Sequence, residues 1–587
     1  MRLFNLFLGH LLDHLFLTDR RIRVAANGTQ DIPHIGACQI RSGHSQPHLI
    51  VPANAGLGTR MPLHRRPQVP FKGALWVAFH TKAQRIHHAN QLFGIGISRP
   101  RRRPKFGPRL GKLSRLHQIA RLFNVCTRRT DDQKNRKNNR GKYLHLISLL
   151  AAITGAQGLG AQTLPAPIGP SDFPIINPDQ AKLGQLLFYD KILSGNQNIS
   201  CGTCHNGDLA GADALSLGIG EGGVGVGTQR RPGSGASKIA KRIPRNAPAL
   251  WNLGHGDVSV MFFDGRIERS DIYGNGFNTP AEEWLPQGLN SLLAAQALFP
   301  LTAQFEMAGN TAENEIAGAI NDRIDAAWPI LAKRVRVIPE YGALFVRAFP
   351  GVQAPQDVTI TQIANALAAF IQAEWQSYDS PFDDFLAGNP DALNTRQKSG
   401  MALFYGRAKC AACHSGSLFT DQNFYALGLP AFGPGRTRAF DPYARDVGRM
   451  GKSDRSEDAY RFRTPPLRNV ALTAPYGHNG AYPDLAGIIA HHGDPRKAAA
   501  NWKPAMAQLV NIPWLAGTDF VIRDDAREMA RQNARLDIQP VTLSDADIQD
   551  LTAFLGALTG KTAITGRPFG IPRTVPSGLS VDRVTKP

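Results

Sequence analysis

Two copies of one short motif constrain the fold of this chain more than any other feature. The stretch CGTCH occupies residues 201–205, and CAACH repeats the pattern at residues 410–414, 209 residues further on. The other two of the six cysteines, Cys38 and Cys126, lie in a separate, strongly basic N-terminal segment. The main body of the chain therefore has no cysteine pair left for an ordinary structural disulfide.

Cysteines three residues apart, followed at once by histidine, are the arrangement that attaches a c-type haem. Two thioether bonds hold the porphyrin, and the histidine lies under the iron as its proximal ligand. A thioredoxin-like redox pair does not need the histidine, and a zinc site needs a second cysteine pair close by. The motifs therefore predict two covalently bound haem c groups. The attachment and proximal residues are Cys201, Cys204, His205, Cys410, Cys413 and His414.

The net charge of +21 is concentrated in the N-terminal quarter of the chain. Residues 1–142 carry 27 lysines and arginines against 5 acidic residues, whereas the remainder carries 40 against 41. Runs such as SRPRRRPKFGPRLGKLSR mix arginine with proline and glycine and show no apolar period, which indicates disorder. A nucleic-acid-binding arm is the alternative. We interpret residues 1–133 as an extension that results from a misplaced translation start, and we expect no nucleic-acid partner.

A secretory signal peptide is predicted at residues 134–162. The basic run KNRKNNRGK precedes YLHLISLLAAITGAQGLGA, an apolar stretch rich in small residues, and cleavage is expected near Ala161. A membrane anchor is the alternative, but the apolar stretch is short and rich in glycine and alanine. Export agrees with the two motifs, because c-type haem is attached outside the cytoplasmic membrane. The predicted location is the periplasm.

Helical patterns joined by long glycine- and proline-rich loops follow the signal. Residues 357–375 and 545–560 have helical apolar spacing, with Thr359 or Thr361 able to cap the first helix and Gly560 a suitable stop for the second. Few strand patterns occur. The fold class expected is mainly α, with two cytochrome c-like haem domains, long loops and little strand. The predicted parts are an N-terminal haem domain at 163–375, a C-terminal haem domain at 376–560 and a tail at 561–587.

Landmarks around the two motifs resemble the bacterial di-haem cytochrome c peroxidase family, which includes the MauG-type enzymes of methylamine utilisation. In order within residues 170–560 they are LGQLLFYDKILSGNQNISCGTCHN, RNAPALWNL, FFDGR, LFPLTAQFEMAG, GMALFYGRAKCAACHSG and FRTPPLRNVALTAPYGHNGAYPDL. The resemblance implies an oxidoreductase that reduces hydrogen peroxide to water with electrons from a small cytochrome c or cupredoxin, and it is compatible with a homodimer. A MauG-like peroxide-dependent oxidation of another protein or small molecule stays open, as does a non-catalytic electron carrier.

The resemblance also implies the residues of a peroxide site at the first haem. The family places an acid before a methionine over the open iron face, here Glu306, and an amide ten residues earlier, here Gln296. Peroxide cleavage moves a proton from one oxygen to the other, and a carboxylate beside the iron can carry that proton. Many members close this pocket with a loop histidine. No histidine occurs between His205 and His255, so we expect an open site.

At the second haem, the resemblance implies electron entry and a distal ligand. The family's ligand stands fourteen residues after the histidine of an H-[DN]-G motif, here His478, which points to His492, with His491 and Met450 as alternatives. Imidazole would lower the reduction potential relative to methionine. Between the haems the family usually has tryptophan before DGR. This chain has Phe263, which is harder to oxidise and disfavours electron hopping.

A calcium ion between the domains is a further implication of the resemblance. The family takes its ligands from the side chain of the asparagine in RNAP, here Asn246, and from carbonyls of the LTAPY segment, here those of Thr473 and Pro475. Hard oxygen ligands of this kind suit calcium. We therefore expect calcium in addition to two haems.

Overall fold

Helices and long irregular segments make up the protein in a computed structural model. The structure describes residues 164–235, 238–438 and 444–585. The expectations for the basic extension, the signal peptide and its cleavage near Ala161 lie outside these residues, as do Cys38 and Cys126.

Short strands contribute little to the described residues, so the prediction of a mainly helical fold with little strand is confirmed. The helices are α5 (Pro178–Tyr189), α6 (Cys201–Cys204), α7 (Leu292–Ala297), α8 (Glu315–Asp322), α9 (Ala327–Arg336), α10 (Pro339–Ala348), α11 (Ile360–Glu374), α12 (Pro381–Leu386), α13 (Thr395–Tyr405), α14 (Met450–Ser453), α15 (Leu485–Gly493), α16 (Pro495–Asn501), α17 (Val521–Asp524), α18 (Ala526–Asn533), α19 (Asp545–Gly556) and α20 (Lys561–Thr565). The strands are β1 (Gly223–Val224), β2 (Arg231–Pro232), β3 (Val260–Met261), β4 (Ile267–Arg269), β5 (Phe277–Asn278), β6 (Phe424–Tyr425) and β7 (Phe462–Arg463). They pair antiparallel as β1–β2, β3–β4–β5 and β6–β7.

Side-chain caps explain where the longer helices begin. The Asn177 side chain accepts two backbone N–H groups at the start of α5, and Thr359 with Gln362 forms a capping box on α11, so Thr359 is the cap. The helix expected to stop at Gly560 ends at Gly556. Gly560 has an extended backbone and stands before α20 as its N-cap, so it starts a new helix and does not close α19.

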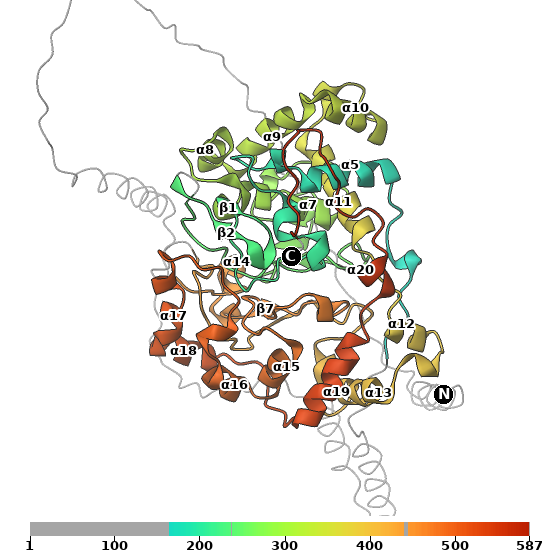
Figure 1. Cartoon of the computed structure of the whole chain (residues 1–587), viewed down its shortest axis with the longest axis vertical. Helices are drawn as coiled ribbons and strands as arrows, with labels where there is room; N and C mark the ends of the chain where they lie inside the picture. The colour runs from blue at the N-terminus through green and yellow to red at the C-terminus, as the bar shows by residue number, and fades with distance from the viewer. Residues whose placement is uncertain (1–163, 236–237, 439–443, 586–587) are drawn as a thin grey trace, which may run out of the picture. The chain divides into compact units, whose positions relative to one another are not determined.

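The same close helix crossing occurs in both halves of the chain. The helix before the first motif, α5, packs along α11, and the helix before the second motif, α13, packs along α19 (Figure 1). A Cβ atom on Gly184 of α5 would lie 1.9 Å from the Ala366 carbonyl oxygen, and one on Gly400 of α13 would lie 1.9 Å from that of Asp550. Both crossings therefore require glycine, which indicates that the two halves are built on one plan.

Each motif lies against an apolar core of its own half. The larger core gathers around α5, α7, α9 and α11 and contacts both cysteines of the first motif, and the smaller one gathers around α12, α13 and α19 and contacts Cys410. The tail after α20 packs on the larger core through Val575. There the Ser577 hydroxyl donates to the buried Asp190 carboxylate at 2.6 Å. The domain boundaries at 375 and 560 stay predictions.

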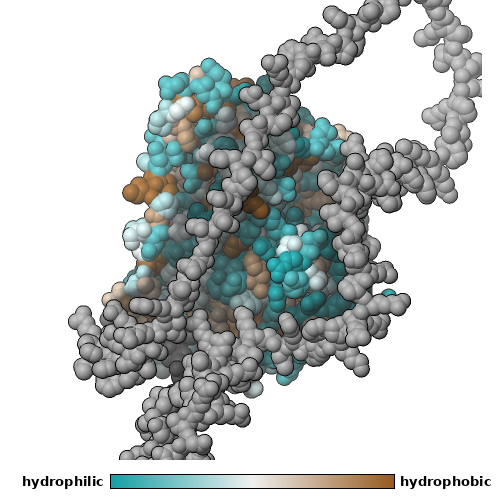
Figure 2. All heavy atoms as spheres, turned by 180° about the vertical axis from the view of Figure 1, so that it is seen from behind, coloured by the Kyte–Doolittle hydropathy of each residue, from teal (hydrophilic) through white to brown (hydrophobic). Residues whose placement is uncertain are grey.

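The surface seen in Figure 2 is mostly hydrophilic, with apolar side chains scattered over it. Scattered exposed apolar groups are ordinary on folded proteins and mark no particular function. Within the three described ranges, no helix combines the length and the apolar character needed to cross a membrane.

Candidate functional site

The first motif forms the single-turn helix α6 with His205 immediately after it. The His205 N–H donates to the Cys201 carbonyl oxygen at 2.9 Å, which closes the turn. The ring Nδ1 lies 3.0 Å from the Gly211 carbonyl oxygen and must donate to it, so Nε2 carries no proton and is available to a metal. Burial lowers the pKa of His205, which favours this neutral form. Both cysteines are free thiols. This donor set fits a haem held by two thioethers and one imidazole.

The second motif repeats this geometry. The His414 N–H donates to the Cys410 carbonyl oxygen at 2.9 Å, and its ring Nδ1 lies 3.0 Å from the Phe419 carbonyl oxygen. Burial lowers the pKa of His414 to about 4, which favours the neutral ring, so its Nε2 also carries no proton and is available to a metal. Cys410 and Cys413 are free thiols like the first pair. The second donor set fits a haem equally well.

His492 faces His414 in a way that suits a shared metal. The two ring centroids are 6.5 Å apart, with 56° between the ring planes. Metal–nitrogen bonds of about 2.0–2.1 Å on opposite sides of one ion would place imidazole centroids roughly 6.3 Å apart. The Nδ1 atom of His492 donates to the Ile488 carbonyl oxygen at 2.8 Å, which leaves Nε2 for a metal.

The two alternatives to His492 are otherwise engaged. His491 is fully buried, with the Tyr482 hydroxyl 2.9 Å from Nδ1 and the Leu427 carbonyl oxygen 2.8 Å from Nε2. Because the carbonyl only accepts, Nε2 is protonated and Nδ1 accepts from Tyr482. Met450 lies in α14, buried in a small separate apolar cluster. We therefore propose His492 as the distal ligand of the second haem.

Glu306 lies near Cys204 of the first motif, in a single π-helical turn at Gln304–Ala308. Burial raises the pKa of its carboxyl group, and the guanidinium groups of Arg266 and Arg436 oppose this rise. The Glu306 carboxylate also acts on the Cys204 thiol. Burial raises the pKa of Cys204 to about 12, and the negative charge of Glu306 contributes to this rise. The loop that contains Gly220 packs against this turn, since a Cβ atom on Gly220 would lie 2.7 Å from the Glu306 carbonyl oxygen.

Gln296 stands near the end of α7, in the segment that leads to the Glu306 turn. Its side chain is half-buried. In the part of the chain that the structure describes, the Gln296 side-chain amide forms no hydrogen bond with Glu306 or with any other group. The amide is therefore available for a ligand.

The family model for di-haem cytochrome c peroxidases matches residues 178–391. The methylamine utilization protein MauG of Methylorubrum extorquens is 30% identical over 319 residues, which cover 54% of this chain and 69% of MauG. The cytochrome c551 peroxidase of Pseudomonas aeruginosa is 30% identical over 319 residues, which cover 54% of this chain and 73% of that peroxidase. This chain belongs to the di-haem cytochrome c peroxidase family. It is an oxidoreductase, and its cofactors are two haems. Among solved structures, it resembles a MauG-like protein associated with microbial copper homeostasis, with 26% identity, a TM-score of 0.45 and coverage of 70% of this chain and 97% of that one.

Sequence reasoning missed a charged cluster beside Glu306. The buried Asp264 carboxylate lies 2.8 Å from Arg245, 3.1 Å from Arg266 and 3.5 Å from Arg436. These three cations hold the pKa of Asp264 well below its usual range, although burial alone would raise it. The FFDGR landmark contains two members of the cluster. Arg245 and Arg436 come from distant segments that only the fold brings together.

Phe263 connects the two halves through its backbone. Its carbonyl oxygen accepts the Arg463 N–H at 2.7 Å, so the segment FFDGR at residues 262–266, here called the DGR loop, lies directly against β7. Thr464, the next residue along the chain, accepts the Thr420 hydroxyl at 2.6 Å. The inter-haem role of Phe263 stays a proposal that this adjacency supports.

The residues predicted to bind calcium each keep an oxygen atom that accepts no hydrogen bond within the described ranges. The Asn246 N–H donates to the His478 carbonyl oxygen at 2.9 Å, and its Nδ2 donates to the Leu215 carbonyl oxygen at 2.8 Å, which leaves Oδ1 for a cation. Within the described ranges, no group donates a hydrogen bond to the carbonyl oxygen of Thr473 or of Pro475. The described residues contain no group of three or more histidine, cysteine or acidic side chains that could hold a metal, so the proposed site would consist of amide and carbonyl oxygens.

Removal of calcium should lower the thermal stability of the purified holoprotein. A cation bound only to the folded state stabilises it, by about 2.7 kcal/mol at a free concentration of 100 Kd. We expect Tm to fall on chelation and to recover on adding Ca²⁺, and we expect Asn246→Ala to be insensitive to both. Calorimetry with metal analysis checks this, and an unchanged Tm after verified metal loss contradicts the site.

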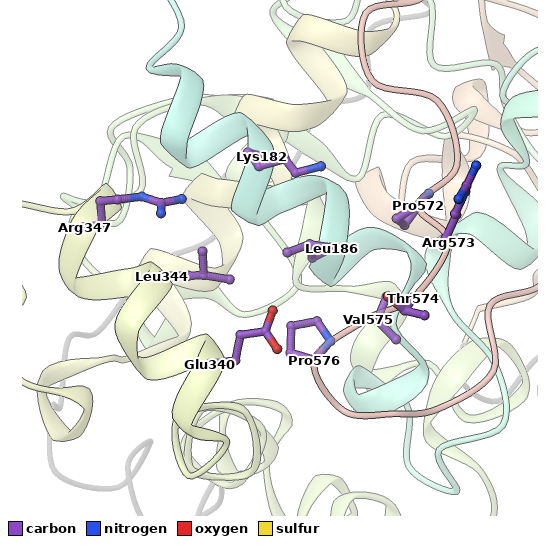
Figure 3. A pocket seen from close by; sticks show the side chains of 10 residues that line it. All are labelled: Lys182, Leu186, Glu340, Leu344, Arg347, Pro572, Arg573, Thr574, Val575 and Pro576. Atoms are coloured by element: carbon purple, nitrogen blue, oxygen red, sulfur yellow. The ribbon is translucent and has the colours of Figure 1, made fainter.

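A cavity of about 390 Å³ lies away from both motifs. Its walls come from α5, α10 and the C-terminal tail (Figure 3). Lys182, Arg347 and Arg573 give it a basic character, with Glu340 as the acidic group. None of the residues proposed for haem or peroxide lines it, so we do not assign it to the reaction.

Proposed function

We propose that this protein is a periplasmic peroxidase that reduces hydrogen peroxide to water with electrons from a small cytochrome c or cupredoxin. The overall reaction consumes one peroxide, two electrons and two protons and yields two water molecules. The first motif would hold the peroxide-reducing haem, and the second would hold the haem that receives electrons.

The difference between the two histidines carries this proposal. His414 faces a second imidazole, that of His492, at 6.5 Å between ring centroids. His205 faces no second imidazole in the described part of the chain, and a half-buried carboxyl group, that of Glu306, lies near its motif instead. Two strong axial ligands suit electron transfer, whereas an open position next to an acid–base group suits the binding and cleavage of a substrate.

Glu306 would act on the protons of peroxide. As a carboxylate it accepts the proton of the oxygen that approaches the metal, and as a carboxylic acid it returns that proton to the outer oxygen, which leaves as water. When bound, the haem supplies the iron that takes up peroxide and the electrons that reduce it. Gln296 would orient peroxide through its unengaged amide. Arg266 and Arg436 favour the carboxylate form of Glu306 against the effect of burial.

A MauG-like oxidation of another protein or small molecule is the second candidate. Its support is the pairing of His414 with His492 and the absence of histidine between His205 and His255. Phe263 disfavours it, because phenylalanine is harder to oxidise than the tryptophan usual at this position.

Steady-state peroxide consumption with a reduced small cytochrome c distinguishes these functions. We expect two cytochromes to be oxidised for each peroxide, without reductive activation, because the first site is open. Peroxide consumption with no oxidation of the cytochrome would favour the MauG-like function. A protein that exchanges electrons with the cytochrome but leaves peroxide intact would be an electron carrier.

A further inference from the structure

Arg463, the last residue of β7, is a half-buried cation that lacks an acidic partner. Its Nε donates to the Phe262 carbonyl oxygen at 3.1 Å, and Nη1 reaches only the carbonyl oxygen of the adjacent Thr464, at 3.3 Å. No carboxylate of the described residues forms an ion pair with this guanidinium. Burial lowers the pKa of Arg463 to about 10, and no neighbouring acid opposes the effect.

Other enclosed arginines of the same region have partners for their charge or for their N–H groups. Arg245 and Arg266 pair with Asp264. Arg230 donates from Nε, Nη1 and Nη2 to the carbonyl oxygens of residues 219, 225 and 220, each at 2.6 Å. Nη2 of Arg463 has no hydrogen-bond partner among the described residues and is not fully enclosed by them, so a ligand can reach it. Proteins rarely bury a cation without an anion, because the lost hydration is not repaid. Arg463 is half-buried, has no acid beside it and keeps Nη2 free, so it is suited to bind an anion that the polypeptide does not provide.

The position of Arg463 indicates where this anion comes from. Strand β7 pairs with β6, with Arg463 opposite Phe424, and β6 follows the second motif closely in sequence. The carbonyl oxygen of Thr464 accepts the hydroxyl of Thr420, next to the Phe419 carbonyl that holds His414. On its other side, Arg463 contacts the DGR loop through two hydrogen bonds. Arg463 thus lies where the segment after the second motif meets the loop that leads to the peroxide site.

We propose that Arg463 binds a propionate carboxylate of a haem at this junction and so sets the reduction potential of that haem. The proposal rests on the two haems of the family and not on the peroxidase activity. Each haem carries two propionates, and a guanidinium group matches a carboxylate with two parallel N–H donors. A positive charge beside a haem favours the added electron of the reduced state, so Arg463 raises the potential.

Replacement of Arg463 in the haem-loaded protein tests this proposal. Arg463→Gln should decrease the equilibrium constant for reduction of one haem by roughly tenfold, which corresponds to about 59 mV for one electron. Arg463→Lys keeps the charge but loses the paired donors, so its shift should have the same sign and a smaller size. Potentiometric titration followed by the haem absorption bands measures both potentials, and the intact mass verifies that both haems remain attached.

Arg336→Gln is the matched control. Arg336 is half-buried, and its guanidinium hydrogen-bonds only to the carbonyl oxygens of Gln356 and Val358, so its removal should leave both potentials unchanged. If neither potential changes in Arg463→Gln, the proposal is wrong. If that variant does not accumulate, wild-type potentials in Arg463→Lys overturn it equally. An exchangeable solvent anion, the other source of negative charge, would make the wild-type potentials depend on phosphate concentration at constant ionic strength, which also overturns it.

Discussion

Replacing Glu306 with glutamine should slow peroxide cleavage by about 10²–10⁴-fold, the range expected for loss of a general acid–base. Glutamine has nearly the same shape, but it cannot accept a proton from peroxide. Stopped-flow mixing of the oxidised protein with peroxide measures this step directly. The resting absorption and EPR spectra should stay close to those of the wild type, because Glu306 is proposed to act on peroxide and not as a resting iron ligand.

The pH dependence gives a second measure of the same role. Burial raises the pKa of Glu306, so its carboxylate is lost on acidification at a higher pH than the usual value of about 4.3 for glutamate. The wild-type rate of peroxide cleavage should therefore fall as pH decreases through this raised pKa, and the glutamine variant should lack that transition. Glu340→Gln, an exposed glutamate on α10, is the control and should behave as wild type. A Glu306→Gln variant with the wild-type rate and pH profile would exclude the acid–base role.

Replacing His492 with alanine should convert one of the two haems from low spin to high spin in the resting protein. The geometry places its ring opposite His414, at 6.5 Å between centroids, and alanine would leave that side of the metal without a strong ligand. EPR and electronic spectra detect the change. The same variant should also be reduced more slowly by the electron donor, because the axial ligands set the reduction potential of the haem.

His491→Gln provides the matched comparison on the same helix. Both ring nitrogens of His491 are engaged, by Tyr482 and by the Leu427 carbonyl oxygen, so this change should leave the second haem low spin. A spin-state change in the His491 variant, with none in the His492 variant, would reverse the assignment.

Sequence alone reached the features that depend on neighbours along the chain. The adjacency of two cysteines and a histidine within one helical turn is local, so both haem motifs could be identified without a structure. The apolar periodicity of residues 357–375 led to α11 and its Thr359 cap in the same way. The stop of α19 at Gly556 was missed, because Gly560 suits a helix end and a helix start equally.

The choice between His491 and His492 needed the tertiary structure. Adjacent residues on a helix point about 100° apart, so the rotation of α15 decides which ring faces His414. That rotation follows from burial of Leu485 and Ile489 in the smaller core. The sequence shows that both histidines are present but does not show how the helix is turned against its neighbours.

The arrangement of the charged groups near Glu306 and the second motif depended on the fold even more. Asp264 gathers arginines 245, 266 and 436, and Arg463 is left without an acid among the described residues. Composition and motif order cannot distinguish these two situations, because each arginine is equally charged in the sequence. Whether a buried charge is paired depends on which distant segments meet in space. The sequence by itself therefore determined the haem-binding motifs, and only the tertiary structure decided which charges and ligands surround them.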